Sequence, residues 1–281
     1  MKLQVVHRTR YQYSSPVRES FNEMRLKPVT NEHQTCDSYI LKVLPAVRLS
    51  HYTYFYANCV HFFDIPDPHT SLLVDSTARV TTQSIALPLD ATPAPMDRVG
   101  ECQQMERCFD FLQESTYVER SPEAWRLALD ITAGLTDVWQ AAQAIMRHVH
   151  ANFAYTPNVT SVHTHMRDVL QGGCGVCQDL AHVMIGLCRA IGIPALYVSG
   201  YLYNGPLDQL IGTQASHAWC EVFLPGVGWR GLDPTNDQQV DDRYVKLAVG
   251  ADYADVPPIR GMYKGVTAHQ MTVEVQVERL D

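Results

Sequence analysis

A glycine-rich turn at residues 172–176 leads directly into a strongly apolar segment, and a cysteine stands at the junction. The stretch 172–182 reads GGCGVCQDLAH, and the apolar residues after it recur at helical spacing: Leu180, Val183, Met184, Leu187, Cys188 and Ile191. Gly192 and Pro194 then supply a helix stop signal. The sequence therefore predicts Cys177 in the first turn of a buried helix. Because helix N-termini stabilise anions, this position favours the thiolate, and Cys177 is the candidate nucleophile.

The composition is that of a globular protein. With 281 residues, 46% of them hydrophobic, the chain can form one large domain or two modest ones. The net charge of −8 opposes a role in binding nucleic acid. No apolar run approaches the ~20 residues of a membrane span, and residues 1–8 lack the apolar core of a signal peptide. We therefore expect a cytoplasmic protein that binds neither nucleic acid nor membranes, and most of its eight cysteines are expected to be small core residues.

Residues 1–97 form a region rich in strand-like segments. The first segment alternates over residues 3–13, interrupted by His7 and Thr9, and a turn signal follows at 14–16. Further strand-like runs cover residues 39–44, 52–56, 60–65, 71–74 and 78–82. Short strands at this spacing predict an antiparallel β sandwich or barrel. The proline-rich run 87–95 then predicts a linker.

From residue 98 the apolar pattern becomes helical. Helices are predicted over roughly 102–112, after a cap at Ser121, after Asp137 and over 166–170, with Gly134 ending the second of them. Extended segments follow Pro194, at 195–203, 216–224, 229–232 and 271–277. Helices followed by strands within one unit predict an α+β domain over residues 98–281, with the C-terminal strand included.

Two polar residues of the second region could serve the cysteine. A thiol nucleophile needs a base, and the base needs a third group to hold its orientation. His217 lies on the second predicted strand of this region, and Asp233 ends the third. If these strands pair as a hairpin against the Cys177 helix, the three side chains can form a triad.

Several blocks of sequence resemble the bacterial transglutaminase-like superfamily, in the branch often described as predicted cysteine proteases. In the second region these blocks are GVCQDLA at 175–181, AIGIPA at 190–195, HAW at 217–219, GW at 228–229 and LDPT at 232–235. The first region is similar to the β-rich domain that precedes the catalytic domain in that branch, through HRTRYQY at 7–13, NEMRLKP at 22–28 and PH at 68–69; DYADVPPIRG at 252–261 fits the same branch. The resemblance implies a papain-like core with Cys177 as nucleophile, His217 as base and acid, and Asp233 as the group that orients His217.

The resemblance also implies acyl transfer through a thioester on Cys177. Water as acceptor gives hydrolysis, and a primary amine gives transamidation. The branch favours a cysteine peptidase or amidase acting on a peptide or protein, without a cofactor, and a protein-glutamine transglutaminase is the alternative. The backbone N–H of Cys177 is a natural oxyanion donor. Tyr155 is the one side-chain candidate for a second donor, although a strand aromatic packed in the core explains this residue better. A non-catalytic binding module is a further alternative, which would not need all three residues of the triad.

Cys174 precedes Cys177 in a CxxC arrangement that departs from the family pattern. A zinc site would need two more ligands, and the spacing of His163 and His165 does not demand them, so we expect no metal. A thioredoxin-like role would need a βαβ context that the flanking residues do not provide. A reversible disulfide between Cys174 and Cys177 could instead switch the enzyme off, in which case Cys174→Ser would protect activity from peroxide. Asp179 and His182 are interpreted as structural residues of the helix.

Overall fold

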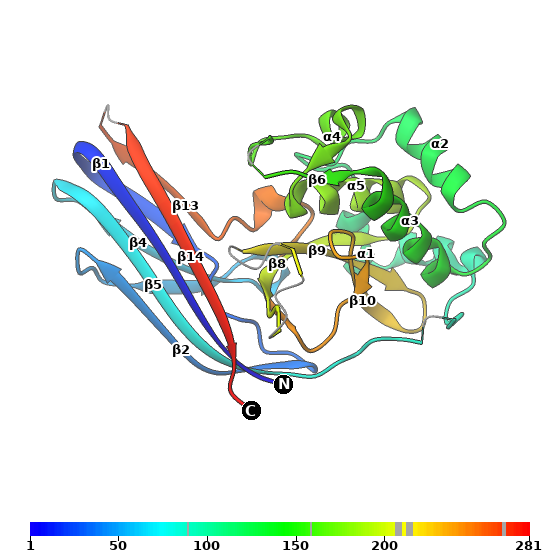
Figure 1. Ribbon diagram of the computed structural model, residues 1–281, viewed down its shortest axis with the longest axis horizontal. Helices are drawn as coiled ribbons and strands as arrows, with labels where there is room; N and C mark the ends of the chain where they lie inside the picture. The colour runs from blue at the N-terminus through cyan, green and yellow to red at the C-terminus, as the bar shows by residue number, and fades with distance from the viewer. Residues whose placement is uncertain (89, 158, 206–209, 212–215, 266–267) are drawn as a thin grey trace.

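The computed structural model describes residues 1–88, 90–157, 159–205, 210–211, 216–265 and 268–281. It has two lobes, a curled antiparallel sheet and a lobe in which helices pack on a second sheet (Figure 1). The prediction of a β-rich first domain followed by an α+β domain is therefore confirmed. Among the described residues, no helix combines the length and the apolarity that crossing a membrane requires.

The first sheet is built around one long strand, β1 (Lys2–Met24), which contributes to both of its halves. The N-terminal half of β1 pairs with β5 and β14, and its C-terminal half pairs with β4 and β13. The strands of this sheet follow the order β2-β5-β1-β4-β3, and β13 and β14 pair with β1 outside this path. The bounds are β2 (Gln34–Leu44), β3 (Ser50–Thr53), β4 (Cys59–Ile65), β5 (His69–Thr82), β13 (Ile259–Lys264) and β14 (His269–Arg279), and a short 3-10 turn, η1 (Phe55–Ala57), connects β3 to β4.

Strand boundaries in this sheet differ from the predicted ones at two places. The turn predicted at 14–16 is an irregularity within β1, where the register with β5 shifts between Gln12 and Val17. The two runs 71–74 and 78–82 belong to the single strand β5. The first error arises because a bulge keeps β1 continuous while placing turn-forming residues inside it. In β5, residues 75–77 are paired with β1 and β2 in an unbroken register, so the polar residues between the two apolar runs do not end the strand.

The polar residues that interrupt the alternation of β1 are buried. His7 and Thr9 are each 2% exposed. The His7 ring bonds the Thr9 hydroxyl at 3.0 Å and the Tyr201 hydroxyl of the second domain at 2.7 Å. Burial lowers the pKa of His7 to about 4, so the ring is neutral at physiological pH. His7 and Thr9 therefore occupy inward-facing positions of β1, and His7 forms a polar contact between the two domains.

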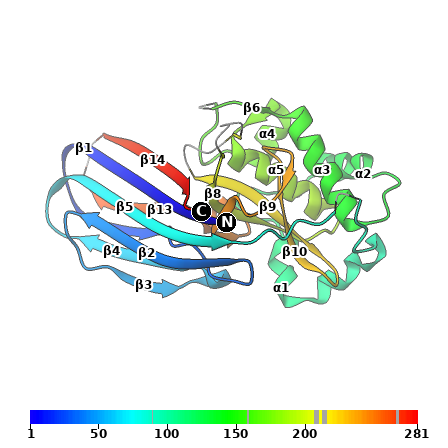
Figure 2. The same cartoon turned by 60° about the horizontal axis from the view of Figure 1, so that its bottom comes forward.

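The C-terminal strand belongs to the first domain and not, as predicted, to the second. β14 pairs with β1 in an unbroken register from Leu3 opposite Arg279 to Tyr13 opposite His269. The two chain ends consequently lie close together (Figures 1 and 2). The alternating pattern of residues 271–277 identifies a strand, but alternation does not identify which open sheet edge accepts it.

The helices of the second domain follow the predicted caps except at its start. Three short pieces replace the single helix predicted over 102–112, because its buried residues recur in steps of three, the 3-10 repeat: Val99 and Cys102, then Cys108 and Phe111. The Ser121 hydroxyl accepts a hydrogen bond from the N–H of Ala124, and the Asp137 side chain caps the next helix. The bounds are η2 (Met96–Gln104), α1 (Glu106–Phe109), η3 (Asp110–Leu112), α2 (Pro122–Ile131), α3 (Val138–Asn152), α4 (Met166–Gly172) and α5 (Cys177–Ala190).

The second sheet is antiparallel and has the order β11-β10-β9-β8-β12. The predicted hairpin is present as β9 and β10, and α5 packs on β8 and β9, where the Cys220 thiol lies 3.3 Å from the carbonyl of Ala181. The bounds are β8 (Ala195–Leu202), β9 (His217–Leu224), β10 (Gly228–Asp233), β11 (Gln238–Gln239) and β12 (Tyr244–Gly250), with η4 (Tyr253–Asp255) after them and a small parallel pair, β6 (Ala154–Tyr155) and β7 (Cys174–Gly175).

Gly200 in β8 is a position where the second sheet has no room for a side chain. A Cβ atom there would lie 2.2 Å from the carbonyl oxygen of Val245 and 2.4 Å from the Trp219 ring. Gly200→Ala must displace β12 or Trp219, and we expect it to lower the free energy of unfolding by about 1–3 kcal/mol. Urea denaturation measures this loss. Gly100→Ala is the control, because nothing lies within 4 Å of its Cβ position; equal losses in both variants would contradict the packing argument.

Candidate active site

Cys177 is the first residue of α5, as predicted, and a fixed turn holds it there. Gly173 ends α4 with φ of 68°, a left-handed conformation that favours glycine. The carboxylate of Asp179 then accepts hydrogen bonds from the N–H of Val176 at 2.8 Å and from the Thr160 hydroxyl at 2.6 Å. Asp179 therefore stabilises the start of the helix, which agrees with its structural interpretation. The side chain of Cys177 is half-buried at this position.

His217 and Asp233 come together through the β9–β10 hairpin. His217 begins β9, and Asp233 ends β10 one residue beyond Leu232, which lies opposite Cys220. The Nε2 atom of His217 lies 2.8 Å from Oδ2 of Asp233, and both side chains are completely buried. A carboxylate at this nitrogen fixes the ring so that Nε2 carries a proton and Nδ1 is left for another partner.

The carboxylate of Asp233 is held by three further donors. Its Oδ2 accepts hydrogen bonds from the Asn236 amide and the Tyr244 hydroxyl, both at 2.8 Å, and its Oδ1 accepts one from the N–H of Thr235 at 2.9 Å. Burial raises the pKa of Asp233, but the charge of His217 and the hydrogen bonds outweigh burial, so the pKa is lowered. Asp233 is therefore an anion held in one orientation.

The imidazole of His217 is shared between Asp233 and Cys177. Burial lowers the pKa of His217, but the Asp233 carboxylate and the Cys177 thiol together raise it to about 10. Among the described residues Nδ1 has no directed hydrogen bond, so it is the nitrogen left for the sulfur, which is near enough to contribute to this pKa. The structure thus brings His217 and Asp233 into contact and places Cys177 beside them.

The raised pKa of His217 predicts a pH dependence of stability. Its folded-state pKa of about 10 lies above the 6.5 of a histidine in the unfolded chain, so the stabilisation is fully present below pH 6.5. It is then lost progressively as the pH rises through 10. Urea denaturation of wild type and of His217→Gln between pH 6 and pH 10 should show the stability difference between them shrinking as the pH increases. A difference that stays constant over this range would contradict the ion pair.

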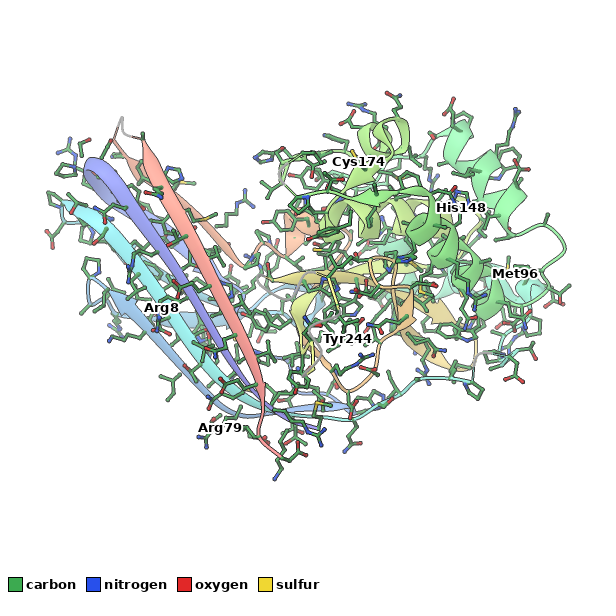
Figure 3. The ribbon with its side chains drawn as sticks, in the orientation of Figure 1. Arg8, Arg79, Met96, His148, Cys174 and Tyr244 are labelled. Atoms are coloured by element: carbon green, nitrogen blue, oxygen red, sulfur yellow. The ribbon has the colours of Figure 1, made fainter. Side chains whose placement is uncertain are left out.

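Two more predicted residues lie close to the turn that precedes α5. Tyr155 pairs with Gly175 across β6 and β7, and burial together with the nearby Cys177 raises the pKa of its hydroxyl. Cys174 pairs with Ala154 in the same small sheet and is half-buried (Figure 3). The Tyr155 hydroxyl is thus near enough to Cys177 for the two groups to interact electrostatically.

The remaining histidines near α5 have structural contacts. His182 is fully buried and accepts a hydrogen bond from the N–H of Tyr253 at 3.2 Å; burial lowers its pKa to about 4. The His163 ring bonds the Tyr117 hydroxyl at 3.2 Å, and His165 caps α4. In the described ranges, no three His, Cys, Asp or Glu side chains are grouped to hold a metal ion.

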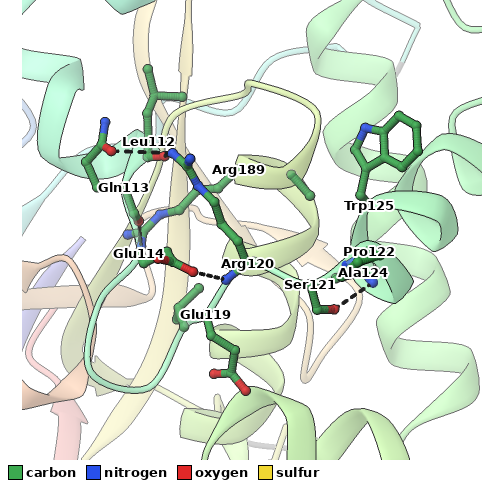
Figure 4. Close-up of a pocket in the computed structure, with 13 residues that line it drawn as sticks. Leu112, Gln113, Glu114, Glu119, Arg120, Ser121, Pro122, Ala124, Trp125 and Arg189 are labelled. Atoms are coloured by element: carbon green, nitrogen blue, oxygen red, sulfur yellow. Dashed lines mark hydrogen bonds between the residues drawn. The ribbon is translucent and has the colours of Figure 1, made fainter.

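Figure 4 shows a cavity at the opposite end of α5. It has a volume of about 480 Å³ and lies between α2 and the last turns of α5, with Trp125, Gly186 and Arg189 in its wall. The Arg189 guanidinium donates to the carbonyls of Ala195, Gln113 and Ala251, so its charge is used within the fold. Since Cys177 begins α5, this cavity is separate from the candidate active site.

Asn236 and Tyr244 are site residues that sequence reasoning did not identify. Asn236 follows the LDPT block by one residue, and a polar side chain that near to Asp233 is a signal that could have found it. Tyr244 is eleven residues from Asp233 and reaches it from β12, at the opposite side of the sheet from β10. No local pattern in the sequence indicates that contact.

Comparison with known proteins gives matches over both domains. The family model described as the transglutaminase-like superfamily matches residues 126–234, and the bacterial transglutaminase-like N-terminal region matches residues 3–81. An uncharacterized protein of Mycobacterium leprae, ML0607, is 34% identical over 282 residues, which cover 99% of each chain. A protein-glutamine gamma-glutamyltransferase of Pseudomonas aeruginosa is 35% identical over 140 residues, 44% of this chain and 20% of that protein.

A solved structure supports the same fold. A protein of Cytophaga hutchinsonii, provisionally described as a cysteine protease, superposes with a TM-score of 0.78 and 24% sequence identity. The match covers 100% of this chain and 92% of that one. The similarity therefore includes the arrangement of both domains.

Proposed function

The chain belongs to the transglutaminase-like superfamily, and from this premise we propose that it is a thiol-dependent acyl-transfer enzyme in which Cys177, His217 and Asp233 act as a triad. The observation that carries the proposal is the completely buried His217–Asp233 pair beside a cysteine at a helix start. A buried ion pair is costly to maintain, and a position facing a thiol gives it a chemical role.

The proposed acylation begins from a thiolate–imidazolium pair. With the pKa of His217 raised to about 10, its ring is a cation at neutral pH, and a cation beside Cys177 favours the thiolate. The sulfur attacks the carbonyl of a peptide or carboxamide, and the first N–H groups of α5 stabilise the oxyanion. His217 then donates its proton to the departing amine or ammonia as the C–N bond breaks, which leaves a thioester on Cys177 and a neutral imidazole.

Deacylation reverses the proton transfer. Neutral His217 takes a proton from water, the resulting hydroxide attacks the thioester, and the carboxylic acid leaves as the thiolate re-forms. Cys177 is only half-buried, so water can reach the thioester, and we propose hydrolysis of a peptide or protein substrate as the main outcome. We also propose that the protein acts in the cytoplasm, because its eight cysteines are spread over a chain too long to need a disulfide framework.

Transamidation is the second candidate function. Its support is the Pseudomonas aeruginosa relative named protein-glutamine gamma-glutamyltransferase, which is 35% identical over the matched residues. A primary amine would replace water as the acceptor, while acylation of Cys177 would be unchanged. The two functions therefore differ in the second half of the reaction.

Three products separate these functions. Casein is incubated with the protein, with and without a fluorescent primary amine, and ammonia, new α-amino groups and bound amine are measured. New α-amino groups indicate a peptidase, ammonia without bound amine indicates an amidase, and bound amine indicates transamidation. The matched pair of variants is Cys177→Ala, which should abolish every product, and Cys174→Ala in the same turn, which should retain them. Products that survive Cys177→Ala would refute the proposed nucleophile.

A further inference from the structure

We propose that Tyr244 is a positioning residue for Asp233 and that the N-terminal domain sets its place by holding strand β12. The inference rests on the proposed role of Asp233 in the triad. It also gives the first domain a function in the chemistry of the second.

Tyr244 is built to control the carboxylate. Its hydroxyl donates to Oδ2 of Asp233 at 2.8 Å, the same oxygen that binds His217. The ring is 3% exposed and packs against Trp219, with the centroids 5.2 Å apart, and against His217 at 6.2 Å. Burial and the Asp233 charge raise the pKa of Tyr244 well above 10, so the hydroxyl remains a donor. Tyr244 thus fixes Asp233 from β12, a strand that is not a hydrogen-bonded neighbour of β9 or β10 in the sheet.

The first domain holds the free edge of β12. The Gln34 amide accepts a hydrogen bond from the N–H of Lys246 at 2.8 Å and donates one to its carbonyl at 2.9 Å. The Asn58 amide makes the same pair of bonds with Val249, at 2.9 and 2.7 Å. Two side-chain amides therefore take the place of a neighbouring strand along the edge that holds Tyr244.

The register of the sheet connects this edge to the candidate site. Lys246 of β12 lies opposite Gly200 of β8, and Gly200 lies opposite His217 of β9. The residue that Gln34 binds is therefore aligned with the catalytic histidine across three neighbouring strands. The missing side chain at Gly200 lets Trp219 and β12 approach closely, which brings Tyr244 within reach of Asp233. In the view of Figure 3, Tyr244 lies below Cys174, in the part of the lobe nearest the lower ends of the long strands.

The test reads the titration of His217 by NMR and therefore needs no substrate. The titratable groups that face His217 are Asp233, Cys177 and Tyr244. Removal of one donor from the carboxylate strengthens its bond to the imidazolium, so Tyr244→Phe should raise the pKa of His217 by about half a pH unit. Gln34→Ala should produce a smaller rise, and no further rise in the Tyr244→Phe background. Gln34→Glu, which keeps the acceptor for Lys246 and loses the donor, should fall between Gln34→Ala and wild type.

The matched control is Gln12→Ala. Gln12 is a glutamine of the same domain, and its side chain bonds the Thr70 carbonyl at 3.1 Å, away from the second domain. Its removal should leave the titration of His217 unchanged. An unchanged pKa in Tyr244→Phe would overturn the positioning role, and additive effects of Gln34→Ala and Tyr244→Phe would overturn the coupling through β12. Failure of the proposed function would appear separately, as an absence of Cys177-dependent products.

Discussion

Asp233→Asn is expected to lower the rate of acyl transfer by about 10³- to 10⁴-fold. The buried carboxylate accepts hydrogen bonds from His217, Asn236, Tyr244 and the N–H of Thr235, and an amide cannot accept from all of them. If the amide turns its NH₂ group to His217, the proton of the ring moves to Nδ1. The nitrogen beside Cys177 then can no longer act as a base.

The same substitution should change the titration of His217 in a defined direction. Burial lowers the pKa of His217, and the Asp233 charge is the first influence that opposes it. Without that charge we expect the pKa to fall from about 10 toward or below 6.5. The rate of ammonia or peptide release against pH measures both effects.

Asp252→Asn is the control for replacing a buried carboxylate. Asp252 is 1% exposed and accepts hydrogen bonds from the N–H groups of Tyr117 and Ala254, outside the candidate site. This variant should lose stability but keep its rate within several-fold of wild type. Equal losses of rate in Asp233→Asn and Asp252→Asn would show that the first loss is a folding effect.

His217→Ala is expected to slow alkylation of Cys177 by iodoacetamide about 100-fold at neutral pH. The substitution removes the imidazolium, which is the cation that stabilises the thiolate. The start of helix α5 is then the remaining influence that favours the thiolate. Mass spectrometry of the digested protein gives the rate for each cysteine separately.

Cys174, Cys36 and Cys59 are the proper reference thiols for this measurement. All three are half-buried, like Cys177, whereas Cys188 and Cys220 are buried and would react slowly for lack of access. Their rates should be the same in wild type and His217→Ala. If Cys177 reacts no faster than Cys174 in wild type, the ion pair does not activate it.

Local signals predicted the parts of the fold that local forces determine. The caps at Ser121 and Asp137 and the apolar period of α5 specify helices, because hydrogen bonds and burial within a few residues decide them. The order of the strands could not be predicted from such local signals. β14 lies at the C-terminal end of the chain and pairs with β1 at the N-terminal end. The sequence at 271–277 carries no information about that partner.

The candidate site divides along the same line. Cys177, His217 and Asp233 could be identified because each lies in a short, contiguous block of sequence that resembles the family. The contact of Tyr244 with Asp233 and that of Gln34 with Lys246 depend on the packing of two domains. Residue 89, which falls within the predicted linker, lies outside the described residues.

The most direct test of the central claim is to trap the acyl-enzyme. A glutamine-containing peptide is mixed with the protein, the reaction is quenched in acid, and the digest is examined by mass spectrometry. We predict the peptide acyl group on Cys177, formed in wild type and Cys174→Ala and absent in Cys177→Ala. An acyl group on another residue, or turnover of the peptide with no acyl group on Cys177 at any time, would contradict a thioester mechanism at this site.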